Sequence, residues 1–164
     1  MRFVGVFALV LLTAGCGNLV GDVEQVGRLG VTVDEAGKPV VLVEPCREGT
    51  ARIDVSLGRS PGMDSEQKNE EVGSWTAAAA SDKPSELEVT APGDAWKGPK
   101  VEPPQKTTHW ILTGTFDGED ETSLAGLDFT GADLAALDTD TVLVGGSGEG
   151  GADQLPRTDF DGDC

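Results

Sequence analysis

The sequence predicts a mainly β domain, an antiparallel β-sandwich or small barrel of about seven or eight short strands with one short helix near residues 131–137. Three observations support this prediction. Short runs alternate apolar and polar residues, most clearly at residues 51–57, as half-buried strands do. These runs recur at regular spacing between turn residues. Glycine contributes 23 of the 164 residues, roughly twice its usual share, and lies mostly between the apolar runs.

The chain begins with a segment that we assign to export and anchoring rather than to the fold. Arg2 precedes an apolar run at residues 3–12, and a stretch of small residues then leads to Cys16. A basic, an apolar and a small-residue region in this order are typical of a secretory signal, and the apolar run is too short to span a bilayer. The segment resembles the lipobox of bacterial lipoproteins, although Thr13 stands where leucine is commonest.

This resemblance implies that residues 1–15 are a lipoprotein signal peptide and that Cys16 carries acyl chains such as palmitate. We expect residues 16–27 to form a lipidated tether, and two or more acyl chains give stable anchoring. The alternative is an ordinary secretory peptide cleaved nearby, in which Cys16 is incidental. Arg2 is the single arginine before the apolar run, which excludes a twin-arginine export signal.

Residues 28–164 are expected to form a single extracytoplasmic domain, whose first half consists of strands joined by polar turns. The alternation at residues 51–57 puts three apolar side chains on one face and three polar ones on the other. Around Trp75, a run of alanines leaves a helix possible in place of a strand. The expected elements are strands at residues 28–33 and 38–43 around a turn at 34–37, a strand at 51–57, a loop at 58–70, and strands at 72–80 and 87–91.

The second half is expected to add a hairpin, the helix and a returning C-terminal segment. Four of the nine prolines lie in residues 92–106, which predicts a loop in which Trp96 plugs one end of the core. Asp133 lies early in the predicted helix, where a negative charge is favourable. The remaining elements are strands at residues 109–117 and 122–130 around a turn at 118–121, a strand at 141–144, a flexible loop at 145–154, and a segment at 157–164 that returns Phe160 and Cys164 to the core.

Two cysteines remain after Cys16 is assigned to lipid. An even pair in an oxidising compartment predicts one disulfide, between Cys46 and Cys164. It would close a loop of about 118 residues and stabilise the fold by roughly 4–5 kcal/mol. The alternative, a metal site built on these two cysteines, lacks ligands because His109 is the only histidine in the chain.

The net charge of −17, from 29 acidic and 12 basic residues, limits the partners to be expected. Such a field repels the phosphates of nucleic acids and the head groups of anionic lipids. We therefore expect no nucleic-acid partner, and a membrane association that depends on the acyl chains. The acidity itself serves either solubility or the attraction of cations and basic partners.

The sequence motifs predict no catalytic residue, no cofactor site and no metal site. Residues 58–62 match G-x-S-x-G, but Pro61 follows the serine and has no N–H to offer an oxyanion hole. His109 is expected to be a structural or surface residue. The acidic residues at 159–163 and 117–121 are expected to be solvated turns rather than calcium loops. Residues 145–151 lack the lysine of a P-loop.

Four pieces of the chain resemble small actinobacterial secreted lipoproteins of unknown function. They are the lipobox at Cys16, the predicted hairpin at residues 31–46, the segment at 129–146 and the segment from Phe160 to Cys164. The resemblance implies a location and a β-rich fold, and it transfers no activity.

We expect a non-enzymatic binding or structural domain, lipid-anchored at the outer face of the cytoplasmic membrane, with an envelope protein or glycan as its partner. A carboxylate-dependent envelope hydrolase is the first alternative, since glycosidases need only two acidic groups. A small solute-binding lipoprotein is the second, although the chain is short for two lobes.

Overall fold

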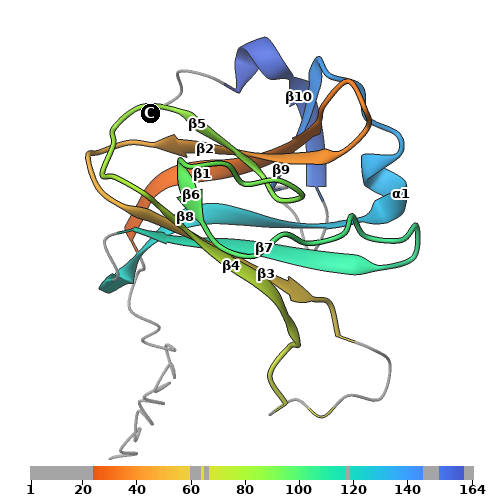
Figure 1. The fold of residues 1–164 in the computed structure, drawn as a ribbon, viewed down its shortest axis with the longest axis horizontal. Coiled ribbons are helices and arrows are strands. Elements are labelled where there is room, and N and C mark those ends of the chain that lie inside the picture. Colours follow the sequence, from red (N-terminus) through yellow and green to blue (C-terminus); the bar gives the residue numbers. More distant parts are fainter. Residues whose placement is uncertain (1–23, 60–63, 65–66, 117–118, 146–151, 161–164) are drawn as a thin grey trace, which may run out of the picture.

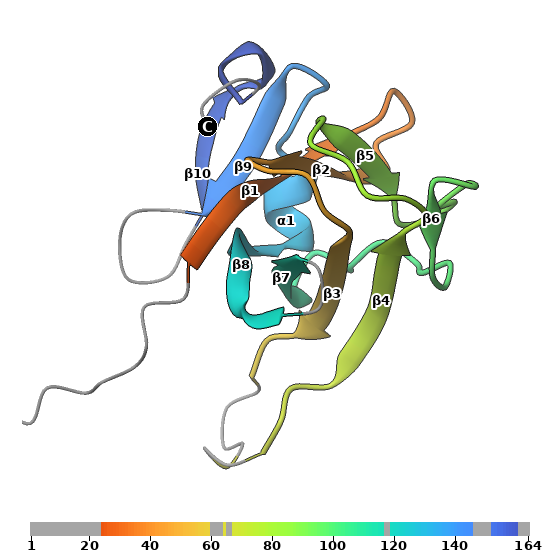
Figure 2. The same ribbon diagram turned by 90° about the vertical axis from the view of Figure 1, so that its left-hand side faces the viewer.

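The computed structural model describes residues 24–59, 64, 67–116, 119–145 and 152–160, with no side chains described at 119–122. The fold is mainly β, as predicted, and the sheet curves into a nearly closed barrel (Figures 1 and 2). The strands are β1 (Glu24–Val33), β2 (Pro39–Pro45), β3 (Ala51–Leu57), β4 (Glu71–Ala77), β5 (Ser85–Glu88), β6 (Trp96–Lys97), β7 (His109–Phe116), β8 (Glu119–Thr130), β9 (Thr141–Gly145) and β10 (Ala152–Pro156). The helices are α1 (Gly131–Leu134) and the 3₁₀ turn η1 (Arg157–Asp159).

Around the barrel the strands follow the order β5-β2-β1-β8-β7-β3-β4-β6. Neighbours are antiparallel except β1 and β8, which are parallel. The barrel closes between β5 and β6 through few contacts. There the Trp96 indole N–H donates to the Glu86 carbonyl at 2.9 Å, and the Val101 N–H donates to the Val89 carbonyl at 3.0 Å.

The sheet divides at β1, and this division positions the site described below. The first part of β1 pairs with β8, whereas Gly30 and Val31 pair with β9 instead. β9 then pairs with β10, so the β9–β10 hairpin extends away from the barrel (Figure 2). The second half of β8 therefore no longer lies beside β1, which flanks its first half.

The barrel interior is filled by side chains from the inward faces of the strands. Trp75, Ile53, Leu112 and Phe116 are fully buried there, and the burial of Ile53 in β3 follows the alternation predicted for residues 51–57. The Trp75 indole N–H donates to the Pro99 carbonyl at 2.8 Å, which satisfies the one polar atom of this side chain. α1 lies at one end of the barrel and buries Leu134 in the same core (Figure 1).

A second, smaller core covers the outer face of β2. It consists of Val40, Leu42, Val142 and Phe160. Because Val41 and Val43 face the barrel interior while Val40 and Leu42 face this outer core, every residue of β2 is buried. The predicted return of Phe160 to a core is confirmed, since its side chain is 1% exposed.

Several boundaries differ from the sequence-based prediction. β1 begins at Glu24, so residues 24–27, which we assigned to the tether, are part of the sheet. The predicted loop at 145–154 contains the end of β9 and the start of β10, and the predicted turn at 118–121 overlaps the start of β8. Pairing with a neighbouring strand, rather than local sequence preference, determines these segments.

Shorter corrections concern the helix and two loops. The predicted helix at 131–137 is α1, which ends at Leu134. The alanines after Ala77 lie outside β4, and two residues of the proline-rich loop form β6. Trp96 in that loop is 4% exposed and closes the barrel as described above, which confirms its expected place at the core.

Candidate functional site

The candidate site is a surface hollow of about 430 Å³, which we call the His109 hollow. It lies between the outer face of β7 and β8 and the β9–β10 hairpin, where the sheet divides. Its lining is mostly polar: His109, Asp128, Thr130, Asp133, Leu143, Ala152 and Gln154. The volume is within the range of sites for small ligands.

The β7–β8 register brings His109 and Asp128 together. His109 pairs with Thr130 and Ile111 pairs with Asp128, so the imidazole and the carboxylate are diagonal neighbours on the outward face. His109 Nε2 lies 3.0 Å from Asp128 Oδ2, and their side chains are 43% and 35% exposed. The other side of the ring packs close to Gly58, whose N–H donates to the His109 carbonyl at 2.7 Å. This backbone contact and the Asp128 contact together fix the position of the ring.

Thr130 and Asp133 form a capping box at the start of α1. The Thr130 hydroxyl accepts from the Asp133 N–H at 3.3 Å, and Asp133 Oδ2 accepts from the Thr130 N–H at 2.7 Å. Such reciprocal bonds satisfy the first backbone donors of a helix. They also hold the Asp133 carboxylate at the edge of the hollow.

The hollow contains groups suited to hydrogen bonding. It offers an imidazole, two carboxylates and the Gln154 carboxamide beside the apolar atoms of Leu143 and Ala152. The Thr130 hydroxyl, the one hydroxyl in this lining, donates to Asp133 Oδ2 at 2.7 Å. The described lining therefore holds no histidine-activated nucleophile of the kind a serine or cysteine hydrolase needs.

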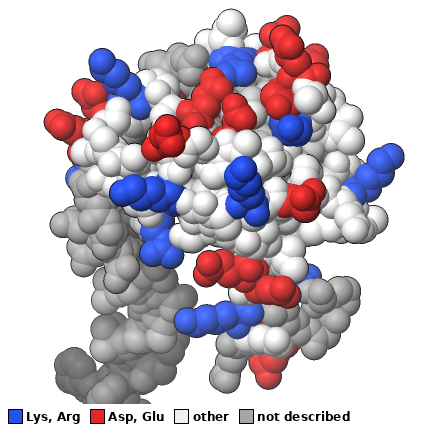
Figure 3. Space-filling view, viewed as in Figure 1, with Lys and Arg blue, Asp and Glu red and all other residues white. Residues whose placement is uncertain are grey.

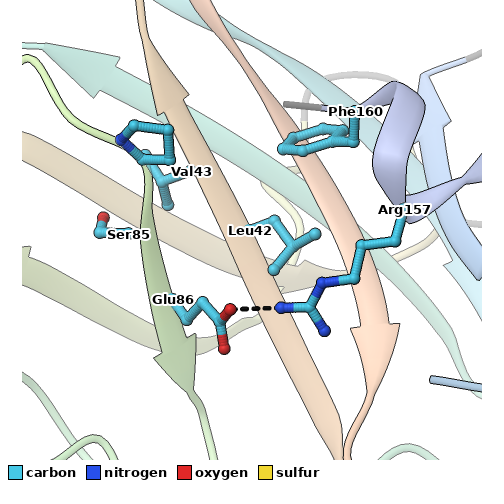
Figure 4. Close-up of a pocket in the computed structure, with 7 residues that line it drawn as sticks. Leu42, Val43, Ser85, Glu86, Arg157 and Phe160 are labelled. Atoms are coloured by element: carbon cyan, nitrogen blue, oxygen red, sulfur yellow. Dashed lines mark hydrogen bonds and ion pairs between the residues drawn. The ribbon is translucent and has the colours of Figure 1, made fainter. Parts of the chain in front are cut away.

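A second cavity, of about 120 Å³, lies over the outer core (Figure 4). Leu42, Val43 and Phe160 form its apolar wall, and Arg157 reaches across to Glu86 on β5 (Figure 4). This volume is below the usual range for ligand sites. Because its charged groups already pair with each other, we treat this cavity as part of the packing of the C-terminal segment.

The residues singled out from the sequence are only partly within the described chain. Cys16, Ser60 and Cys164 lie outside it. Cys46 directly follows β2 and is not a free thiol. The pairing of Cys46 with Cys164 stays a prediction.

The acidic segments proposed as turns are also only partly described. Residues 117–118 and 161–163 lie outside the description, and the side chains at 119–121 are not described. Across the residues that are placed, no three histidine, cysteine or acidic side chains gather to hold a metal ion.

His109 is exposed, as expected for a surface residue, but its partners were not found from the sequence. Alternation in β8 puts Asp128 on the outward face with His109, and this signal was available. Nothing in the sequence connects Gln154 to this site, because β10 reaches it only through its pairing with β9.

On the face seen in Figure 3, acidic and basic side chains are interspersed and separated by uncharged surface. No helix in the described part of the chain is long and apolar enough to cross a membrane.

We compared the chain with protein-family models, curated proteins and solved structures, and no match was found.

Proposed function

We propose that the protein is a lipid-anchored domain on the outer face of the cytoplasmic membrane that binds a component of the cell envelope at the His109 hollow. The observation that carries the proposal is the convergence of polar side chains from three strands and α1 on one hollow, beside a barrel interior filled by apolar side chains. Convergent polar groups beside an apolar wall are typical of a binding site.

The proposed anchor would hold the domain near the membrane. β1 begins eight residues after Cys16. An extended chain of that length spans at most about 28 Å. A domain held within this distance of the lipid head groups meets membrane-proximal envelope material first.

The lining favours a neutral glycan over an anionic polymer. The two carboxylates accept hydrogen bonds from hydroxyl groups, the Gln154 carboxamide both accepts and donates them, and Ala152 offers apolar contact to a sugar ring. Asp128 and Asp133, together with the net charge of −17, repel anionic ligands. An envelope protein is the alternative partner, and the titration with oligosaccharides described below distinguishes the two.

The binding proposal is tested by NMR titration of the chain with soluble neutral oligosaccharides prepared from envelope polysaccharide. Because His109 is the only histidine, its ring signals report on the hollow without ambiguity. We expect these signals to shift on binding and Gln154→Ala to weaken binding by about tenfold, the cost of one lost hydrogen bond. Gln67→Ala, in the exposed loop after β3, is the matched control. Binding that is equally unaffected by both substitutions would exclude the hollow as the site.

The anchor is tested separately by mass spectrometry of the native protein. The expected product begins at Cys16 and carries a diacylglycerol thioether and an N-acyl chain, and Cys16→Ser releases the domain from the membrane. An unmodified amino end on membrane-associated protein would contradict the anchor and leave the binding proposal standing.

One observation favours hydrolysis as a second candidate. Both Asp128 and Asp133 border the His109 hollow, and two carboxylates at one site are the minimum for glycoside hydrolysis. Release of new reducing ends from the bound glycan, abolished by Asp128→Asn and by Asp133→Asn, would establish it. Unchanged glycan after prolonged incubation supports binding alone.

A further inference from the structure

We propose that the glycan site extends beyond the His109 hollow and that a second sugar ring of the same glycan lies against Ile111. The inference rests on the proposed function and deepens it, since it makes the ligand an oligosaccharide of at least two sugar units. The second position is a shallow hollow of about 260 Å³ on the outward face of β7 and β8, which we call the Ile111 hollow. Its lining consists of Ile111, Leu112, Thr113, Gly126, Leu127 and Asp128.

The two hollows are continuous at Asp128, which lines both of them. Its Oδ2 lies 3.0 Å from His109 Nε2, and no hydrogen bond within the described residues uses Oδ1, so this oxygen is left to accept from a sugar hydroxyl. His109 and Ile111 are two residues apart on β7, so they share its outward face and their Cα atoms are about 6.8 Å apart. Neighbouring rings of one sugar chain bridge this distance, and one ligand can therefore occupy both hollows.

A β-bulge in the β7–β8 pairing produces the Ile111 hollow. The register shifts between Leu112 and Gly114 of β7. Thr113 therefore opposes two residues of β8, Ala125 and Gly126, and Ala125 is also the last residue of β8 that pairs with β1. Gly126 adds no side chain, and a Cβ there would lie 2.4 Å from the Leu112 carbonyl oxygen. The surface at the bulge thus stays open, at the point where the sheet divides.

The surface around Ile111 combines an apolar centre with polar neighbours. Ile111 is half-buried, and its cross-strand partners are Ser56 on β3 and Asp128 on β8. With the exposed Thr113, these neighbours provide two hydroxyls and one carboxylate beside one aliphatic side chain. A sugar ring has the matching pattern, because its C–H groups suit apolar contact and its hydroxyls donate to and accept from polar groups at its edge.

Size and charge favour a second unit of a neutral glycan over a separate ligand. At about 260 Å³, the Ile111 hollow is smaller than the sites that hold a whole small ligand, which begin at about 300 Å³. It therefore serves as an extension of the His109 hollow beside it, whose volume is about 430 Å³. The described linings of the two hollows contain no lysine or arginine, and an anionic ring would have no cation to pair with.

The test follows two NMR probes while the chain is titrated with neutral envelope oligosaccharides separated by length into fragments of one, two and three sugar units. The ring signals of His109, the only histidine, report on the His109 hollow. The chain has two isoleucines, so the Cδ1 methyl of Ile111 reports on the second hollow, and Ile53, which is 0% exposed in the barrel interior, is an internal control. We expect the one-unit fragment to shift only the His109 signals, and the longer fragments to shift the Ile111 methyl as well.

Affinity gives a second measure of the same inference. The two-unit fragment should bind about tenfold more tightly than the one-unit fragment, as for burial of about two methyl groups of Ile111 against the second ring. Ile111→Thr keeps a β-branched residue in the strand and removes most of this contact. It should abolish the tenfold gain and change the affinity for the one-unit fragment less than about twofold. Thr115→Ala is the matched control, because Thr115 lies on the same outward face of β7 and belongs to neither lining.

The outcomes separate this inference from the proposed function. If every fragment shifts the His109 signals and none shifts the Ile111 methyl, the inference is overturned and binding at the His109 hollow stands. Equal affinities for the one-unit and two-unit fragments would also overturn the inference alone. Shifts at neither residue would overturn both. Because the wild-type titration involves no substitution, the decision does not depend on how well Ile111→Thr folds.

Discussion

Single residues on β2 illustrate how far the sequence predicts burial. The two-residue period of a strand puts Val41 and Val43 on the face of β2 that fills the barrel, and puts Leu42 and Glu44 on the opposite face, which the barrel alone would leave solvated. The structure buries that face as well, because Phe160 and the C-terminal segment cover it. The acidic residue within an otherwise apolar strand was a visible signal. Its partner, Arg28, could be identified only once the hairpin register was known.

The space beside Gly30 gives the first prediction. A Cβ at this position would lie 2.6 Å from Val142 Cγ1 and 2.7 Å from Phe160 Cε2. We expect Gly30→Ala to destabilise the fold by about 1–3 kcal/mol, the usual cost of overpacking, as measured by urea denaturation. In a Phe160→Leu background the cost should fall, because one of the two opposing groups is smaller. An equal cost in both backgrounds would mean that the clash lies elsewhere.

The turn before β9 gives a pH-dependent prediction. The Thr141 hydroxyl donates to Asp138 Oδ1 at 2.7 Å and the Asp140 N–H donates to it at 3.1 Å, and these bonds lower the pKa of Asp138. The pKa of Asp138 is lower in the folded state than in the unfolded state, where it is about 3.9. The ionised carboxylate therefore stabilises the fold at pH values above the unfolded-state pKa. That contribution disappears as the pH falls through the folded pKa.

Side-chain NMR titration measures this effect directly. Thr141→Val should raise the pKa of Asp138 towards its ordinary value, because the principal hydrogen bond is lost. Thr113→Val, on the exposed face of β7, is the matched control and should leave the titration of Asp138 unchanged. If the titration midpoint of Asp138 is the same in both variants, the hydroxyl is not the cause.

Strands whose sequence alternates apolar and polar residues were predicted. Strands that form only because they pair with a neighbouring strand were not. β3 was predicted at its observed bounds. β10 has the sequence ADQLP, which lacks both alternation and β-forming residues, and it forms because each of its residues pairs with β9. Its proline and its acidic residue suit an edge strand, since both discourage pairing with another chain. Edge position, however, is visible only after the strand order is known.

The η1 segment is held by two arginines, since Arg28 also donates to the Phe160 carbonyl, and we expect them to contribute unequally. Arg28 pairs with Glu44, whose side chain is 4% exposed, whereas Arg157 pairs with Glu86, whose side chain is 56% exposed. Arg28→Ala leaves a buried carboxylate unpaired and should cost about 3 kcal/mol. Arg157→Ala breaks a solvated ion pair and should cost less than about 1 kcal/mol. Urea denaturation compares the two variants, and equal losses would show that the Glu44 pair is not effectively buried.

At the scale of the whole molecule, the fold class was predicted but the strand order was not. The local patterns give a mainly β domain with a β1–β2 hairpin, and both are confirmed. They contain no information on the parallel pairing of β1 with β8, which joins segments about a hundred residues apart. This pairing ends at Arg28, and the pairing of β1 with β9 from Gly30 onward creates the division in the sheet where the His109 hollow lies. The candidate site is thus a product of topology, which explains why the sequence, in which His109 was expected to be a structural or surface residue, predicted no site here.

The net charge of −17 gives the last prediction, which concerns the molecule as a whole. With 29 acidic and 12 basic residues, the folded chain repels itself, and salt screens this repulsion over a Debye length of about 8 Å at 0.15 M. Raising NaCl from low concentration to about 0.15 M should therefore raise the Tm by about 2–4 °C, the shift that corresponds to 1 kcal/mol in a chain of this size.

Calorimetry in NaCl and in CaCl₂ of matched ionic strength separates screening from specific binding. Screening predicts equal shifts in the two salts, and it predicts that most of the gain occurs below about 0.15 M, where the Debye length shortens most. A larger shift in CaCl₂ would reveal a calcium site in the acidic turns, because a ligand that binds only the folded state adds its own stabilisation. A Tm that does not rise in either salt would show that self-repulsion is negligible. The acidity would then serve solubility alone.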